Sequence, residues 1–231
     1  MAGLRVEAIE FLIQAAQQLQ VSPVVKYTAL SLFAHRFLPS LSRFVDDNDE
    51  RNWLLQPIRE SNLQLFALVA IWISSKVGNI HDPRALSVKS LKSLGDKIIQ
   101  DQHFITRDLL KAEVLMMQVV NFEISSLDTT FSFLEEILIK LKEVAKVGEV
   151  LNFEACMEIM DLLYEKEEIS LLSSSPCLLA GAILVASYLI TVPKQKLEFP
   201  ILPWVNFVTS YKEEHIAKVV RDILKHIFEP S

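Results

Sequence analysis

The sequence has 231 residues, a length that fits one large domain or two compact units of about 110 residues each. Half of the residues (51%) are apolar, which supports a sizeable core and argues against a disordered chain. The net charge of −6 argues against direct binding of nucleic acid, because phosphate contacts need clustered Lys and Arg.

The two cysteines, Cys156 and Cys177, lie among apolar residues, so we expect buried free thiols and no disulfide. We expect no secretory leader, since two glutamates interrupt the place of its apolar core. Two apolar stretches, residues 63–75 and 177–192, are shorter than the roughly 18 to 20 residues of a membrane span. We expect each to be a helix that is buried on all sides within a helical protein. We therefore expect no membrane partner.

Apolar residues in the first part of the chain recur with a helical period. The first predicted helix ends before Ser22, and its apolar face carries Ile9, Leu12, Ile13 and Ala16. Ser22 and Pro23 form an N-cap and a proline at the first helical position, which predicts a second helix to about residue 38. Residues 39–60 contain two prolines and an acidic cluster and are predicted to be a loop.

Three further helices are predicted before the middle of the chain. The third spans residues 62–76, and the fourth begins near Ser87, with Gly95 as a weak point. Thr106 is predicted to cap a fifth helix that ends near Val120. The inner face of this fifth helix is predicted to carry Leu110, Val114 and Met117.

The helical pattern starts again after a connector at residues 121–128. A sixth and a seventh helix follow, and a serine-proline pair, Ser175 and Pro176, opens an eighth as Ser22 and Pro23 open the second. A short ninth helix near residues 204–211 and a strongly amphipathic tenth complete the series.

The third and eighth helices are the most apolar in their halves of the chain. Small residues match between them at a constant offset of 112 residues, Ala70 with Ala182 and Ser75 with Ser187. We therefore predict an all-α fold of two tandem five-helix repeats, each with a central apolar helix. The predicted units are residues 1–124 and 125–231.

Motifs for catalysis are not found in the sequence. No Cys/His spacing fits a zinc site, and there is no Gly-rich phosphate loop and no GxSxG elbow. The five histidines are scattered, and adjacent acidic residues on amphipathic helices are expected to be solvated. We therefore predict no catalytic residue, no metal and no cofactor.

Several segments, taken in order, resemble the cyclin family. They are Phe33-Ala34-His35-Arg36-Phe37-Leu38, Leu63-Gln64-Leu65, Ser74-Ser75-Lys76, Lys111-Ala112-Glu113, Phe122-Glu123-Ile124 and Ser175-Pro176-Cys177-Leu178-Leu179-Ala180. The resemblance covers nearly the whole chain, each half matching one cyclin-box repeat. Small plant cyclins of the J type are the better match, since a long N-terminal tail is lacking.

This resemblance implies a regulatory subunit that binds and activates a cyclin-dependent Ser/Thr protein kinase in the cell cycle, in the nucleus, the cytoplasm or both. A Lys at the end of the third helix and a Glu in the fifth bind the kinase in this family, and these fall at Lys76 and Glu113. The other kinase contacts map onto Ile73, Val77, Ile80, Met117, Phe122 and Ile124. Together they would form a groove for the amphipathic regulatory helix of the kinase.

A second family site, which docks Arg-x-Leu peptides of substrates or inhibitors, is only partly matched. Its residues map onto Leu4, Arg5, Phe11, Leu63 and Gln64. Glu7 stands where an apolar residue is expected, and Gln14 replaces an acidic one, so we expect weak docking.

Two other functions remain open at this point. One is a cyclin-fold transcription adaptor, which would meet DNA through basic surfaces that the net charge disfavours. The other is a helical scaffold whose partner is not a kinase, because a fold alone does not decide a function.

Overall fold

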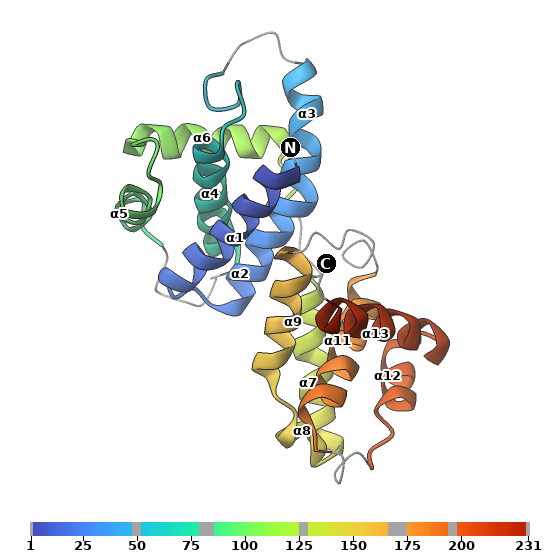
Figure 1. The fold of residues 1–231 in the computed structure, drawn as a ribbon. Coiled ribbons are helices and arrows are strands. Elements are labelled where there is room, and N and C mark those ends of the chain that lie inside the picture. Colours follow the sequence, from blue (N-terminus) through green and yellow to red (C-terminus); the bar gives the residue numbers. More distant parts are fainter. Residues whose placement is uncertain are drawn as a thin grey trace. The chain divides into compact units, whose positions relative to one another are not determined.

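The computed structural model describes residues 2–47, 52–78, 86–124, 129–165, 175–193 and 198–229. Within these ranges every regular element is a helix (Figure 1), so the predicted all-α class is confirmed. The chain divides into two compact units, Met1–Leu127 and Asp128–Ser231, close to the predicted boundary.

The first unit is built around α4 (Glu60–Gly78). Every residue from Leu65 to Ile71 is at most 1% exposed, so this helix is buried on all sides, as predicted. Its neighbours in contact are α1, α2, η1, α5 and α6. Their bounds are α1 (Ala2–Gln18), α2 (Pro23–Leu30), η1 (Ser31–Phe37), α5 (Val88–Ile98) and α6 (Thr106–Val119).

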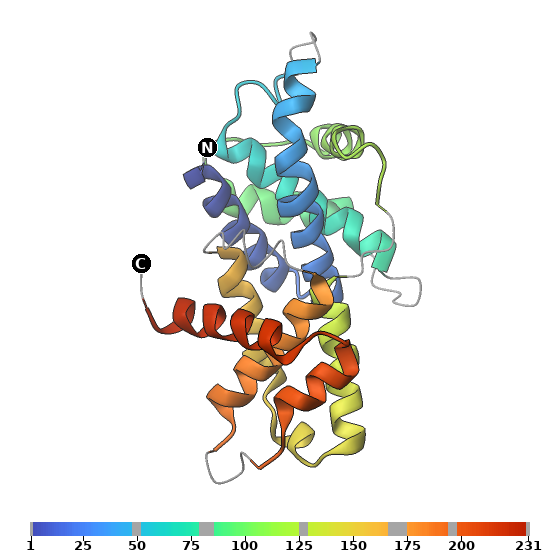
Figure 2. The ribbon, with the colours of Figure 1, turned by 90° about the vertical axis from the view of Figure 1, so that its right-hand side faces the viewer.

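The helix that begins at Pro23 does not end near residue 38 as predicted. It continues through η1, a π-helix, into α3 (Leu38–Asp47), and Figure 2 shows the three as one rod. The prediction of a loop from residue 39 was wrong because it took Pro39 as a stop. Hydrogen bonds in the π-helix join each N–H to the carbonyl five positions earlier, as from Leu38 N–H to Phe33 O. Pro39 comes directly after this wider turn and does not end the helix.

The second unit repeats the arrangement around α11 (Pro176–Thr191). Residues 179–188 are all buried, and α11 contacts α7, α9, α12 and α13. The bounds of the surrounding helices are α7 (Thr130–Val144), α8 (Val147–Val150), α9 (Phe153–Glu165), α12 (Ile201–Thr209) and α13 (Glu213–Phe228). A central apolar helix therefore organises each unit, and the short α8 is an element of the second unit that the sequence did not predict.

No helix in the described ranges is both long and apolar enough to cross a bilayer. The apolar lengths of α4 and α11 instead form the centres of the two cores. Hydrophobic burial, rather than any single polar contact, is the main source of stability in each unit.

The packing of α11 against α12 predicts the effect of one small substitution. A Cβ atom added at Gly181 would lie 2.7 Å from Cγ1 of Val205, which is fully buried. We expect Gly181→Ala to lower the free energy of unfolding, because overpacking costs about 1–3 kcal/mol and the helix propensity of Ala returns only about 1 kcal/mol. Urea denaturation measures this loss.

The matched control for that substitution is the same change in a Val205→Ala background. Removing Cγ1 makes room for the new methyl group, so Gly181→Ala should then be neutral or stabilising. An equal loss in both backgrounds would contradict the close contact between these helices.

Candidate functional site

The predicted pair Lys76 and Glu113 is brought together by two helices that pack on each other. Lys76 lies in the last turn of α4, and Glu113 lies in the middle of α6. Lys76 Nζ donates to Glu113 Oε1 at 2.6 Å, which also makes an ion pair. The two residues therefore form one charged centre at the surface of the first unit.

An aromatic ring holds the lysine from the other side. Lys76 Nζ lies 3.5 Å from the ring centroid of Trp72, four residues earlier on the same face of α4. Trp72 is only 5% exposed, so its ring is fixed in the core while its face meets the ammonium group. Such a cation–π contact contributes about 0.5–1 kcal/mol at an exposed site. The lysine is thus oriented before any partner arrives.

The charged centre stays accessible to a partner. The side chain of Lys76 is 44% exposed and that of Glu113 is 23% exposed. An ammonium group has three N–H donors, and Glu113 uses one of them. Since another N–H is directed at the face of Trp72, one donor of Lys76 and the second carboxylate oxygen of Glu113 can still bind the backbone groups of another protein.

The outer face of α6 is apolar, contrary to the prediction for this helix. Leu110 and Val114 were predicted on the inner face, but they are 46% and 54% exposed, and Met117 is half-buried. The inner face is formed by Leu109, Ala112, Met116 and Val119. Both sets recur every three or four residues, so the helical period could not decide between them, and packing on α4 does.

The beginning of α6 also differs from the prediction. Ile105, not Thr106, is the N-cap residue, and its backbone N–H donates to Asp108 Oδ2 at 2.9 Å. A carboxylate in the first turn satisfies one free N–H and favours the helix dipole. The predicted start was thus one residue late, with a different capping side chain.

A strained turn displays Phe122 just after α6. Asn121 and Phe122 have φ angles of 53° and 58°, and an aromatic residue in this left-handed region is a rare outlier. Phe122 N donates to Met117 O at 2.7 Å, and the guanidinium of Arg36 donates to Glu123 O. These bonds hold a phenyl ring that is 65% exposed.

The remaining predicted kinase-contact residues are placed unevenly. Val77 is 42% exposed beside Lys76, and Ile124 is half-buried. Ile73 is 3% exposed and belongs to the core, where it supports the surface from beneath. Ile80 lies outside the described residues.

The residues of the predicted peptide-docking patch are largely engaged within the first unit. Phe11 and Leu63 are 7% and 4% exposed and belong to the core that α1 and α4 share. Arg5 Nη2 donates to Ala34 O at 3.3 Å, and Gln64 Nε2 donates to Glu60 Oε1 at 2.8 Å. Leu4 is half-buried, while Glu7 and Gln14, the two departures from the family pattern, are exposed.

Metal-binding clusters and reactive thiols are not found in the described parts of the chain. No three His, Cys, Asp or Glu side chains there could hold a metal ion. Cys156 and Cys177 are free thiols. Burial raises the pKa of Cys156 to about 11 and also raises the pKa of Cys177, so neither is a ready nucleophile at neutral pH.

The surface that remains is suited to binding a protein. Exposed or half-buried apolar side chains lie on the two helices that carry the charged pair and on the turn after α6, namely Val77, Leu110, Val114, Met117 and Phe122. Such a surface can hold the apolar face of an amphipathic helix, while the charged pair binds its backbone or polar groups.

Comparisons with known proteins give consistent results. The family model described as "Cyclin, N-terminal domain" matches residues 2–125, more than half of the chain. The chain is 55% identical over 229 residues to "Cyclin-J18-like" of Oryza sativa subsp. japonica, covering 96% of this chain and 87% of that protein. It is 56% identical over 224 residues to "Cyclin-J18" of Arabidopsis thaliana, covering 97% of this chain and 94% of that protein.

A solved structure shares the fold. The X-ray structure of a viral cyclin from herpesvirus saimiri superposes with a TM-score of 0.70 at 16% sequence identity, covering 99% of this chain and 86% of that one. At this identity the likeness concerns the fold alone.

The hydrogen bond from Arg36 to Glu123 O is expected to stabilise the turn at Phe122. We expect Arg36→Ala to speed amide hydrogen exchange at residues 122–124 by about fivefold to tenfold, since losing one such hydrogen bond costs about 1 kcal/mol. Exchange within α4 should not change. Arg43→Ala, which removes another exposed arginine of the same helical rod, is the control, and an equal effect of both would contradict the role of Arg36.

Proposed function

The chain belongs to the cyclin family, within its J-type subgroup, and we propose that it binds and activates a cyclin-dependent Ser/Thr protein kinase in the control of the cell cycle. The observation that carries the proposal is the contact of Lys76 with Glu113 at 2.6 Å, on two helices that also expose apolar side chains. This role would need no catalytic group of the chain's own.

The proposed partner segment is the regulatory helix of the kinase. Lys76 donates its remaining N–H group to a carbonyl oxygen of that helix, and Glu113 accepts from a backbone N–H with its second oxygen. The apolar face of the helix packs on Val114, Met117 and Phe122. The ring of Trp72 and the carboxylate of Glu113 reduce the entropy that Lys76 would lose on binding, since they already hold the ammonium group.

Binding of this helix would activate the kinase by shifting a population. In the inactive kinase the regulatory helix is rotated outward, which separates its Glu from the catalytic Lys. A surface that binds the inward position better than the outward one raises the fraction of active kinase. Shifting the ratio from 1:99 to 99:1 needs about 5.5 kcal/mol of differential binding.

The charged pair alone cannot supply this free energy. An exposed ion pair contributes about 0–1 kcal/mol. Burial of roughly 220 Å² of apolar surface would supply the rest at about 25 cal/mol per Å². The exposed apolar face of α6 is therefore assigned most of the binding energy, and Lys76 and Glu113 are assigned orientation and specificity.

Reversing both charges tests the pair. We expect Lys76→Glu with Glu113→Lys to weaken binding of the co-purifying cyclin-dependent kinase by about a hundredfold, within the 2–5 kcal/mol range for interfacial charge pairs. The new pair can still form across the two helices, so folding should persist. Isothermal calorimetry measures the affinity, and circular dichroism checks the fold.

The chain offers a closely matched control for that reversal. Lys140 and Glu136 form a 2.6 Å ion pair on α7, in the second unit, with exposures of 47% and 58%. Their reversal, Glu136→Lys with Lys140→Glu, should leave kinase affinity unchanged. Equal kinase binding by the wild type and the Lys76/Glu113 variant would reject the assigned site, and salt-sensitive DNA binding without kinase binding would favour the transcription-adaptor function instead.

The outer face of α6 generates a separate prediction. Val114→Glu places a charge among the apolar residues and should lower kinase affinity at least tenfold with little loss of stability, because Val114 is 54% exposed. Ile139→Glu on α7, where the side chain is 53% exposed, should leave the affinity unchanged. A similar affinity for the two variants would show that α6 does not face the kinase.

A further inference from the structure

A groove runs along a different face of α6 from the one that carries Glu113. Lys111, Leu115 and Gln118 recur at spacings of four and three, so they form one stripe along the helix. Glu113 is two residues from both Lys111 and Leu115, a turn of about 200° around the helix axis. The stripe and the charged pair therefore point in nearly opposite directions from α6.

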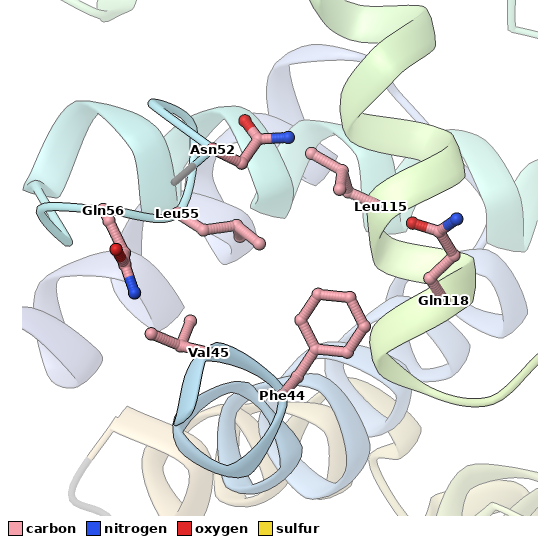
Figure 3. A pocket seen from close by; sticks show the side chains of 7 residues that line it. All are labelled: Phe44, Val45, Asn52, Leu55, Gln56, Leu115 and Gln118. Atoms are coloured by element: carbon pink, nitrogen blue, oxygen red, sulfur yellow. The ribbon is translucent and has the colours of Figure 1, made fainter. Parts of the chain in front are cut away.

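The first part of this groove is a pocket of about 350 Å³ between α3, the turn at residues 52–56 and α6. Figure 3 shows apolar side chains and side-chain amides around its opening: Phe44, Val45, Leu55 and Leu115 with Asn52, Gln56 and Gln118. Among the described residues, none hydrogen-bonds to the side-chain amides of Gln56 and Gln118. Such amides can pair with the backbone of an extended peptide whose apolar side chain enters the pocket.

The second part is a shallower hollow of about 600 Å³ that shares Asn52 and Leu115 with the first. Trp53, Arg107, Leu110, Lys111 and Val114 complete its lining. Leu110 and Val114 also belong to the apolar surface assigned to the kinase helix, so the two sites share this edge of α6 and differ in the residues on either side of it. Trp53 is 45% exposed, and its ring stacks on the buried ring of Phe104 with centroids 6.2 Å apart. A fixed, half-exposed tryptophan is a suitable platform for an apolar side chain.

The charge of the groove points to the chemistry of its partner. Among the described residues that line either part, Arg107 and Lys111 are the only charged ones, although the chain as a whole has a net charge of −6. Both are exposed, and they lie four residues apart on one face of α6. Arg107 also lies in the first turn, where the positive end of the helix dipole adds to the attraction for an anion.

We propose that this α3–α6 groove, lined by α3, residues 52–56 and α6, docks a short extended acidic peptide segment of a partner protein. Its carboxylates pair with Arg107 and Lys111, one apolar side chain packs on Trp53, and a second enters the pocket of Phe44 and Leu55. The groove is separate from the predicted peptide-docking patch on α1 and α4, where Phe11 and Leu63 are buried. The chain would thus recruit peptides through a site that α3 and residues 52–56 build.

An array of synthetic 12-residue peptides tests this proposal without any kinase. Each peptide carries two apolar side chains at varied spacing among glutamates, and a matched set replaces the glutamates with lysines. Fluorescence anisotropy with the full chain should show binding of glutamate peptides and none of their lysine counterparts. Because the kinase is absent, the result does not depend on the proposed function.

Three variants locate the binding. Arg107→Glu with Lys111→Glu should weaken peptide affinity at least tenfold, since both contacts become repulsive. Gln118→Trp, at an exposed position, should weaken peptide affinity because the larger ring fills the pocket between Phe44 and Leu55. The control is Arg221→Glu with Lys225→Glu, two exposed residues of α13 with the same four-residue spacing, and it should leave peptide affinity unchanged.

The proposal also predicts a footprint. Bound peptide should slow amide hydrogen exchange at residues 44–45, 52–56 and 107–118 of the wild-type chain. Absence of any glutamate peptide that binds more tightly than its lysine counterpart overturns the proposal. Binding that survives the Arg107/Lys111 reversal, or a footprint on α1 instead, overturns it as well.

Discussion

The contact between Lys76 and Glu113 depends on the burial of α4. A charged pair drawn from two helices keeps its geometry only if the helices are fixed, and seven consecutive residues of α4 with at most 1% exposure fix this one. Trp72 connects the buried core of α4 to the surface ion pair, because its ring lies in the core and the face of that ring contacts the ammonium group of Lys76. The pair adds little stability, so its value lies in presenting two oriented polar groups on a rigid surface.

The central helices could be predicted because their signals are local, whereas Lys76 and Glu113 were predicted only through the resemblance to the cyclin family. Long apolar runs at residues 63–75 and 177–192 allow few structures other than helices buried on all sides. The face of α6 could not be predicted, since Leu110, Val114 and Met117 share the spacing of the true inner residues. Apolar residues in excess of those needed for the core are themselves an indication of a binding surface.

The segment after residue 38 shows where a local rule fails. Pro39 is a helix breaker by its chemistry, yet the π-helix before it allows the rod to continue to Asp47. This extension brings Phe44 and Val45 beside Leu115 and so builds one side of the α3–α6 groove (Figure 3). The groove joins α6 to two segments that lie far before it in sequence, and no pattern within any one of the three indicates it.

The most direct measurement of the central claim is a structure of the chain in complex with the cyclin-dependent kinase that we propose as its partner. The expected result has Lys76 Nζ and the Glu113 carboxylate within hydrogen-bonding distance of the backbone of the kinase regulatory helix, with Val114 and Phe122 covered by its apolar face. A complex in which the kinase sits on another surface, leaving Lys76 and Glu113 in solvent, would contradict the claim.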